Sequence, residues 1–381
     1  MDPNALAASI TTTSARDLCS SIRYDTSPPT TLVDGLDALL HGAGTPLRRG
    51  DVVEVQGLTG SGKTQLLVRL AVNALLPRKA HVRLDRTTLS VPVGGKEETV
   101  VWIDCTSKFD VDRTVNVLRK HLVEAINAFR RPKGIGAPTD DEVQSLVDEC
   151  LTRLHVFTPT STLQLAATVH SLPEWYEANA SEPIGFVLID GMTEFAWADQ
   201  HEREEDARRR EAPKDEADPA PARPSRPIPL QLFTASIARL RRTLAPVTFV
   251  TQWVMRPSHP HSHLSQQGLP FYRAHFTPPL YPSLGSTSRR NPDDPLAPVY
   301  FPPSSSPAFS LAFHITMHPP SKPMFRKGVS LQQIVAEQRK TVKAIEANGH
   351  TTEGIVCVLR DSVGRELGSW EMSIGPDEIV A

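Results

Sequence analysis

The sequence predicts an α/β fold in which a mostly parallel central sheet carries helices on both faces. Short apolar runs alternate along the chain with segments of helical periodicity, which is the order that parallel strands and their crossover helices produce. The apolar run at 52–55 leads into the glycine-rich run GLTGSGKT at 57–64, and a helical segment follows. Strand, glycine-rich turn and helix in this order are the context in which a P-loop occurs.

Composition narrows the classes of protein that the chain can represent. It has 381 residues, 39% of them hydrophobic, and its 34 prolines gather in two long stretches, so we expect one ordered domain of ordinary size. A formal net charge of -2 argues against a protein that coats nucleic acid by bulk electrostatics. The four cysteines form no CxxC pair, which indicates neither a disulfide framework nor a zinc site. Because no long apolar run or secretory signal is present, the sequence predicts a soluble intracellular protein without a membrane span.

The individual elements follow from apolar spacing, taken in chain order. Leucines at 32, 36, 39 and 40 share a helical face, and the segment 77–98 is expected to be a connection. The other expected elements are strands at 52–55, 99–104, 154–157, 184–190, 247–252, 309–316, 354–360 and 368–374, and helices at 65–75, 112–129, 163–172, 233–244 and 331–346.

Proline and charge divide the chain into ordered and loop segments. Residues 1–29 are polar and too few for a domain, so they are expected to form a flexible N-terminal arm. Residues 30–381 are expected to form a single domain with long disordered loops, as insertions at about 200–229 and 256–307.

The run at 57–64 has the residue types that phosphate binding needs. Gly57, Gly60 and Gly62 allow successive backbone N–H groups to turn inward around an anion at a helix N-terminus. Lys63 would reach the β- and γ-phosphates, and the hydroxyl of Thr64 would coordinate Mg²⁺. The alternative is a glycine-rich turn without a ligand. The expected nucleotide-binding residues are Gly57, Leu58, Thr59, Gly60, Ser61, Gly62, Lys63, Thr64 and Gln65, with ATP and Mg²⁺ as ligands.

Asp190 is the candidate second metal ligand. It ends the apolar run 186–189 downstream of the P-loop, as a Walker B carboxylate does. Apolar runs that end in aspartate are common, so the prediction depends on the P-loop upstream. We therefore expect Thr64 and Asp190 to hold Mg²⁺ together.

Four segments in a fixed order resemble the core of a known family. GLTGSGKT is followed by IDCTSKFD at 103–110, LIDGMTEFAW at 188–197 and FVTQW at 249–253. This order is similar to the ATPase core of RecA-like recombinases, and among them to the short eukaryotic recombinase paralogues. The segment TTLVDGLDALL at 30–40 also resembles the approach to that core. The resemblance covers residues 30–244 and the strand at 247, and it covers the C-terminal strands more weakly. It implies a RecA-like P-loop ATPase core with C-terminal β-strands.

The resemblance also implies roles for single residues. Gln252 corresponds to the glutamine that senses the γ-phosphate, although a plain strand-end glutamine is the alternative. Active recombinases place a glutamate two residues after the aspartate that ends the second strand, and this chain has Thr106 there, counted from Asp104. A threonine hydroxyl cannot act as a general base near neutral pH, and Asp104, a possible substitute, is structural in the family. We therefore expect ATP binding with weak or absent hydrolysis, and we assign no catalytic residue.

The function that the resemblance implies is in homologous-recombination repair of DNA double-strand breaks. The chain would be an ATP-binding subunit of a nuclear paralogue complex that assists recombinase filament assembly on single-stranded DNA. A sister recombinase paralogue would contact this core, and single-stranded or branched DNA would be contacted through the complex. Fewer than about 30 residues precede the core, so the N-terminal helical domain of full-length recombinases is not expected, which suits a terminal subunit.

Two other readings stay open. The chain could be a catalytically active DNA-dependent ATPase or another P-loop phosphotransferase, which a base near the phosphates would favour. It could also be a docking scaffold for which the nucleotide is dispensable.

Overall fold

The computed structural model describes most of the expected core. The described residues are 28–84, 87–133, 136–179, 182–211, 229–253, 311–319, 354–362, 364–375 and 378–380, with the single positions 269, 330 and 333. The N-terminal arm up to residue 27 lies outside them. So do the insertion at 256–307 apart from position 269, and the expected helix at 331–346 apart from position 333. The division of the chain into an arm and one domain stays a prediction.

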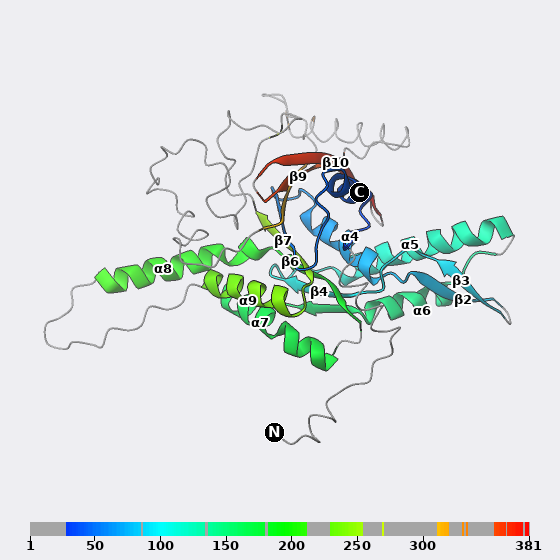
Figure 1. Ribbon diagram of the computed structural model, residues 1–381, viewed down its shortest axis with the longest axis horizontal. Helices are drawn as coiled ribbons and strands as arrows, with labels where there is room; N and C mark the ends of the chain where they lie inside the picture. The colour runs from blue at the N-terminus through cyan, green and yellow to red at the C-terminus, as the bar shows by residue number, and fades with distance from the viewer. Residues whose placement is uncertain are drawn as a thin grey trace, which may run out of the picture.

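A sheet of nine strands among the described residues forms the centre of the molecule (Figure 1). Its order is β11-β10-β9-β8-β1-β7-β6-β4-β5. The strands from β8 to β5 are parallel, and β9, β10 and β11 add an antiparallel extension. Their bounds are β1 Val52–Gly57, β4 Thr99–Asp104, β5 Leu154–Phe157, β6 Ile184–Asp190, β7 Val247–Trp253, β8 Phe313–His318, β9 Ile355–Asp361, β10 Glu366–Ile374 and β11 Ile379–Val380.

Helices cover both faces of this sheet, so the predicted fold class is confirmed. One face packs into a core with α3, α4, α5 and α6, and the other with α7 and α9. Figure 1 shows α4 on one side of the strands and α7 with α9 on the other. The bounds are α3 Asp34–Gly42, α4 Lys63–Leu75, α5 Val111–Arg130, α6 Asp140–Leu151, α7 Thr162–Asn179, α8 Ala196–Glu211 and α9 Pro229–Thr243.

Burial on both faces explains why the central strands are continuous apolar runs. Every residue of β1, β4 and β6 is buried, as strands between two helical layers must be. Phe186 and Phe249 meet edge to face across β6 and β7, with ring centroids 5.7 Å apart. Because β1, β4, β6 and β7 run parallel, their carboxyl ends lie together at one end of the sheet.

The structure differs from the sequence prediction in three places. The segment 77–98, expected to be a connection, contains the hairpin of β2 (Lys79–Leu84) and β3 (Thr87–Pro92). Helix α6 was not expected, although a capping box between Thr139 and Glu142 begins it. The expected insertion at about 200–229 begins inside α8, which is helical to Glu211, and 212–228 lie outside the described residues.

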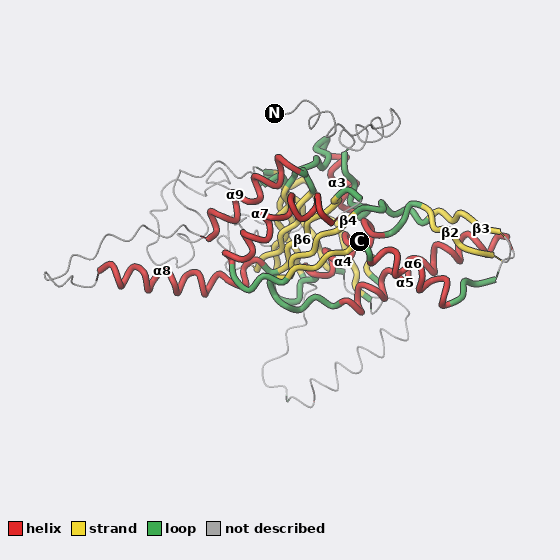
Figure 2. The backbone as a smooth tube through the Cα atoms, turned by 90° about the horizontal axis from the view of Figure 1, so that it is seen from below, coloured by secondary structure: helices red, strands yellow, loops and turns green. Residues whose placement is uncertain are grey.

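The hairpin with α6, and the helix α8, lie at opposite ends of the molecule. The β2–β3 hairpin, α5 and α6 project at one end, and α8 extends at the other (Figure 2). Charged residues four positions apart, such as Glu204 with Arg208 and His201 with Glu205, support α8 along its exposed length. A composition that indicates a loop is therefore also compatible with an exposed helix.

Candidate nucleotide-binding site

The P-loop joins β1 to α4 and needs each of its three glycines. Gly60 and Gly62 have φ values of 77° and 86°, in the left-handed region that favours glycine. Gly57 is required by space instead, because an added Cβ would lie 2.2 Å from Ser61 Oγ and 2.8 Å from the carbonyl oxygen of Met317. The loop thus closes tightly under the N-terminus of α4, where backbone N–H groups can receive an anion.

Lys63 is buried beneath this loop. Its Nζ donates to the carbonyl oxygens of Gly57 and Leu58, both at 2.9 Å. Burial lowers the pKa of Lys63 to about 8, and the nearby charge of Asp190 opposes that shift. An ammonium held in this way has a strong electrostatic preference for an anionic ligand such as a phosphate.

Two residues that are far apart in the sequence meet beside Lys63. Thr64 Oγ1 donates to Asp190 Oδ2 at 2.8 Å, so the predicted pair lies within hydrogen-bond distance. Thr251 Oγ1 donates to the other carboxylate oxygen of Asp190 at 2.6 Å and accepts from Gly191 N at 2.7 Å. Burial raises the pKa of Asp190, and the two threonine hydroxyls oppose this shift. Hydroxyl and carboxylate oxygens are the ligands that Mg²⁺ prefers, so Thr64 and Asp190 could hold this ion.

Thr251 was missed by sequence reasoning. It precedes Gln252 at the end of the buried strand β7, and a polar residue at that point was the available signal. The parallel pairing of β6 with β7 and of β1 with β7 is what brings this strand end to Asp190 and the P-loop.

Gln252 is fully buried, and its side chain has no hydrogen-bond partner among the described residues. Because side chains alternate along a strand, it points to the face of the sheet opposite Thr251, the face that also carries Gln56 of β1. A buried amide without partners costs about 1–3 kcal/mol, which makes its presence at this strand end unusual for a purely structural residue.

At the end of β4, the Asp104 carboxylate is hydrogen-bonded to the turn that follows. Asp104 accepts from the backbone N–H of Thr106 at 2.9 Å and of Phe109 at 2.7 Å, and from Thr106 Oγ1 at 2.7 Å. The carboxylate therefore shapes the turn after β4, and the Thr106 hydroxyl is directed at it. Cys105 between them is buried, and burial raises the pKa of its thiol, so it is not a thiolate at neutral pH.

Comparison with known proteins gives three informative relatives. No protein-family model matches the chain. The DNA repair protein XRCC2 homolog of Arabidopsis thaliana is 27% identical over 176 residues, 41% of this chain and 44% of that protein. The DNA repair protein XRCC2 of Mus musculus is 28% identical over 151 residues, 40% of this chain and 43% of that protein. The DNA repair and recombination protein RadA of Halobacterium salinarum is 28% identical over 163 residues, 42% of this chain and 43% of that protein.

Over this matched core the chain is similar to RecA-like recombinases and to the recombinase paralogue XRCC2. The match spans less than half the length of each of these three relatives. Similarity to RecA-like recombinases implies that this core binds a nucleotide. No helix in the described ranges is both long and apolar enough to cross a membrane.

Proposed function

We propose that this recombinase-paralogue chain binds ATP with Mg²⁺ and acts in homologous-recombination repair of DNA double-strand breaks. It does so in the nucleus, as a subunit of a paralogue complex that assists recombinase filament assembly on single-stranded DNA. The observation that carries the proposal is the convergence of Lys63, Thr64 and Asp190 at the carboxyl edge of the sheet, in a core that resembles XRCC2.

The residues present fit the nucleotide and the ion. The P-loop N–H groups and Lys63 would hold the phosphates, and Thr64 with Asp190 would hold Mg²⁺, which neutralises phosphate charge when it is bound. Gln252 would sense the γ-phosphate, and its unpartnered amide at a strand end beside the P-loop strand is consistent with that role.

In this proposal the chain binds ATP as a ligand, and hydrolysis is weak or absent. The Thr106 hydroxyl is hydrogen-bonded to Asp104, and the Asp104 carboxylate already accepts three hydrogen bonds. The hydroxyl is not a base near neutral pH, and the three hydrogen bonds give the Asp104 carboxylate a structural role in the turn after β4. This argues against the alternative of a DNA-dependent ATPase or another P-loop phosphotransferase.

The partner is a sister recombinase paralogue that docks at the open edge of the sheet. The edge strand β5 pairs only with β4 among the described strands, and its Val156 is 39% exposed. Such an edge presents unpaired backbone groups to which an extended segment of another chain can add. Single-stranded or branched DNA is contacted through the assembled complex.

The first test is a calorimetric titration with ATP and Mg²⁺. Wild-type protein should bind, and Lys63→Ala should lose binding, while Lys79→Ala, an exposed lysine on β2, should leave it unchanged. Equal titration curves for wild type and Lys63→Ala would refute the nucleotide site.

The second test measures turnover and filament assembly. Phosphate release should stay at background with and without single-stranded DNA. DNA-stimulated release would favour the ATPase alternative. The paralogue complex should change the rate or lifetime of recombinase filaments, and no change in either would contradict the proposed role.

A further inference from the structure

The C-terminal strands pack against the P-loop itself. A Cβ at Gly62 would lie 2.6 Å from Ile355 Cδ1, and 3.1 Å from both Ile374 Cδ1 and Met372 Cε. These side chains come from β9 and β10, which lie more than 290 positions further along the chain. Figure 1 shows β10 and the C-terminus beside α4, and Figure 2 places the C-terminus at α4 as well. The turn that begins α4 therefore has an apolar wall made by the C-terminal end.

One arginine ties the P-loop helix to this wall. Arg113 Nε donates to Gln65 Oε1 at 3.2 Å, and Arg113 NH2 donates to the carbonyl oxygen of Gly375 at 2.7 Å. Gln65 follows Thr64 directly in the first turn of α4. The planar guanidinium makes both hydrogen bonds from a single rigid group. A displacement of Gly375 would therefore also displace the side chain of Gln65.

The turn after β10 is also held by charge. Gly375 N donates to the carbonyl oxygen of Glu378 at 2.8 Å, which closes the turn into β11. The Glu378 carboxylate pairs with Lys120 of α5. That hydrogen bond lowers the pKa of Glu378, and the charges of Lys120 on α5 and of Arg69 on α4 lower it further. Charge and hydrogen bonding thus seat this turn between α4 and α5.

We propose that the C-terminal clip, residues 372–375 and 378–380, regulates the nucleotide site. The seated clip holds Gly62 and Gln65 in the arrangement that receives phosphates, and release of the clip lowers nucleotide affinity. Coupling of this kind is reciprocal, so bound nucleotide in turn holds the clip in place. The inference rests on the proposed binding of ATP at this P-loop.

A charge-swap cycle tests the clip away from the phosphates. Lys120→Glu and Glu378→Lys each place like charges together at the clip, and the double variant restores the opposite pair. We expect each single variant to weaken Mg·ATP binding about two- to fivefold, and the double variant to recover part of that loss, because Glu124 and Arg69 stay beside the exchanged charges. Arg365→Glu is the matched control, because it breaks an ion pair to Asp361 within the same hairpin.

Amide hydrogen exchange supplies a second readout that does not depend on affinity. The single variants should exchange faster at 366–375 without nucleotide, and Mg·ATP should slow exchange there in the wild type. The clip proposal is wrong if both single variants bind Mg·ATP with wild-type affinity. It is also wrong if Mg·ATP does not change the exchange rate at 366–375 in the wild type. If wild type and Lys63→Ala bind ATP equally, the nucleotide proposal itself fails, which separates the two outcomes.

Discussion

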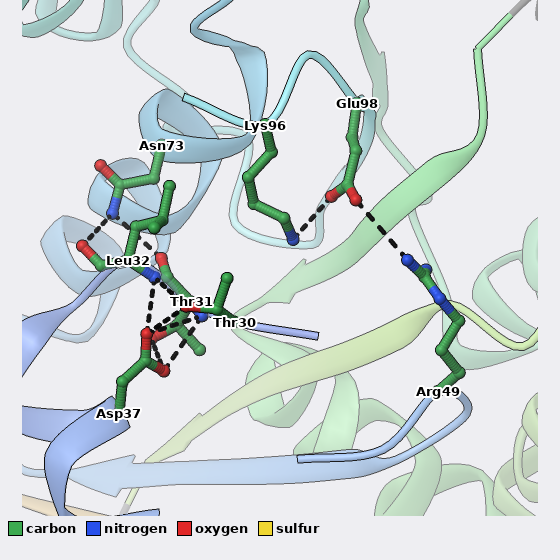
Figure 3. A network of polar contacts seen from close by, with 8 residues as sticks. All are labelled: Thr30, Thr31, Leu32, Asp37, Arg49, Asn73, Lys96 and Glu98. Atoms are coloured by element: carbon green, nitrogen blue, oxygen red, sulfur yellow. Dashed lines mark hydrogen bonds and ion pairs between the residues drawn. The ribbon is translucent and has the colours of Figure 1, made fainter. Parts of the chain in front are cut away.

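Asp37 should be among the most important single residues for the stability of the approach to the P-loop. Its carboxylate accepts hydrogen bonds from Thr31 N at 3.1 Å, Thr31 Oγ1 at 2.7 Å and Leu32 N at 3.0 Å, and also from the Thr30 hydroxyl. Asn73 of α4 donates to the carbonyl oxygens of Thr31 and Leu32 from the other side (Figure 3). The segment 30–32 is thereby anchored to the helix that follows the P-loop.

The cost of Asp37→Ala follows from these contacts. Thr31 is fully buried, so the substitution leaves its N–H and hydroxyl without their carboxylate partner, whereas Leu32 N keeps a contact to Thr30 Oγ1 at 3.2 Å. Hydrogen bonds to a charged group contribute about 1.5–3 kcal/mol each and do not add fully, so we expect a loss of about 3 kcal/mol. For a domain of this size such a loss lowers Tm by about 6–12 °C.

Thermal and urea unfolding, followed by tryptophan fluorescence, would measure this loss. Asp34→Ala is the matched control, because Asp34 is an exposed carboxylate in the first turn of the same helix. It loses only a favourable interaction with the helix dipole, about 0.5 kcal/mol. If the two variants lost the same stability, the hydrogen bonds to Asp37 would not be the cause and the reasoning would be wrong.

Three further predictions concern the site and the opposite edge of the sheet. Phosphate should raise the Lys63 pKa above its unliganded value of about 8, so ATP affinity should be level below pH 7 and fall by up to about tenfold per pH unit above 8, measured by calorimetry. Gly185→Ala places a Cβ 2.0 Å from Glu98 Oε2, and urea unfolding should show a loss of about 2–4 kcal/mol. Thr251→Val removes a hydroxyl from Asp190 and should weaken Mg·ATP binding about tenfold in the same calorimetric assay.

Each of these three has an internal control. Lys79→Ala, which alters an exposed lysine on β2, should keep the wild-type pH profile, and a level profile up to pH 9.5 in the wild type would contradict the Lys63 argument. Gly42→Ala is the control for Gly185→Ala. An added Cβ at Gly42 meets nothing within 4 Å, so this variant should leave the free energy of unfolding unchanged or raise it. Thr248→Val is the control for Thr251→Val. It alters another buried threonine of β7 and should leave Mg·ATP affinity unchanged.

The Gly185 prediction depends on a buried ion pair at the amino-terminal ends of β4 and β6, away from the P-loop. Glu98 pairs with Lys96 at 2.6 Å and with Arg49 at 3.6 Å, as Figure 3 shows. Lys96 also lies 4.3 Å from the ring centroid of Phe186. A displaced Glu98 leaves buried cations without their partner, and an uncompensated buried charge is costly.

Local apolar pattern was enough to predict the central elements. The expected strands at 154–157 and 184–190 coincide with β5 and β6. For β6 the reason is burial on both faces, because a strand covered by helices must be apolar along its whole length. The P-loop could also be located from the sequence, because its glycines are required by the conformation of one short, continuous turn. The run Val143, Leu146, Val147 and Cys150 behind the capping box at Thr139 was a comparable signal for α6, and it was overlooked.

Features that depend on pairing between distant strands could not be found in this way. Thr251 reaches Asp190 only because β6 and β7 are neighbours, and no pattern within β7 reports its neighbour. The contacts of Arg113 with Gln65 and Gly375 likewise join three separate elements. Composition was misleading at α8, because ion pairs four residues apart support a helix that has almost no apolar face.

The arrangement of the site explains how nucleotide binding can persist without turnover. The groups proposed to bind phosphate and Mg²⁺ come from the P-loop and from the end of β6, whereas the water-activating position belongs to the turn after β4. In that turn, Asp104 accepts hydrogen bonds from Thr106 and Phe109, so its carboxylate stabilises the loop. A change at position 106 can therefore remove hydrolysis while Lys63, Thr64 and Asp190 keep their contacts. Under the proposed function, bound nucleotide would stabilise the C-terminal clip and the interfaces of a complex for as long as it stays bound.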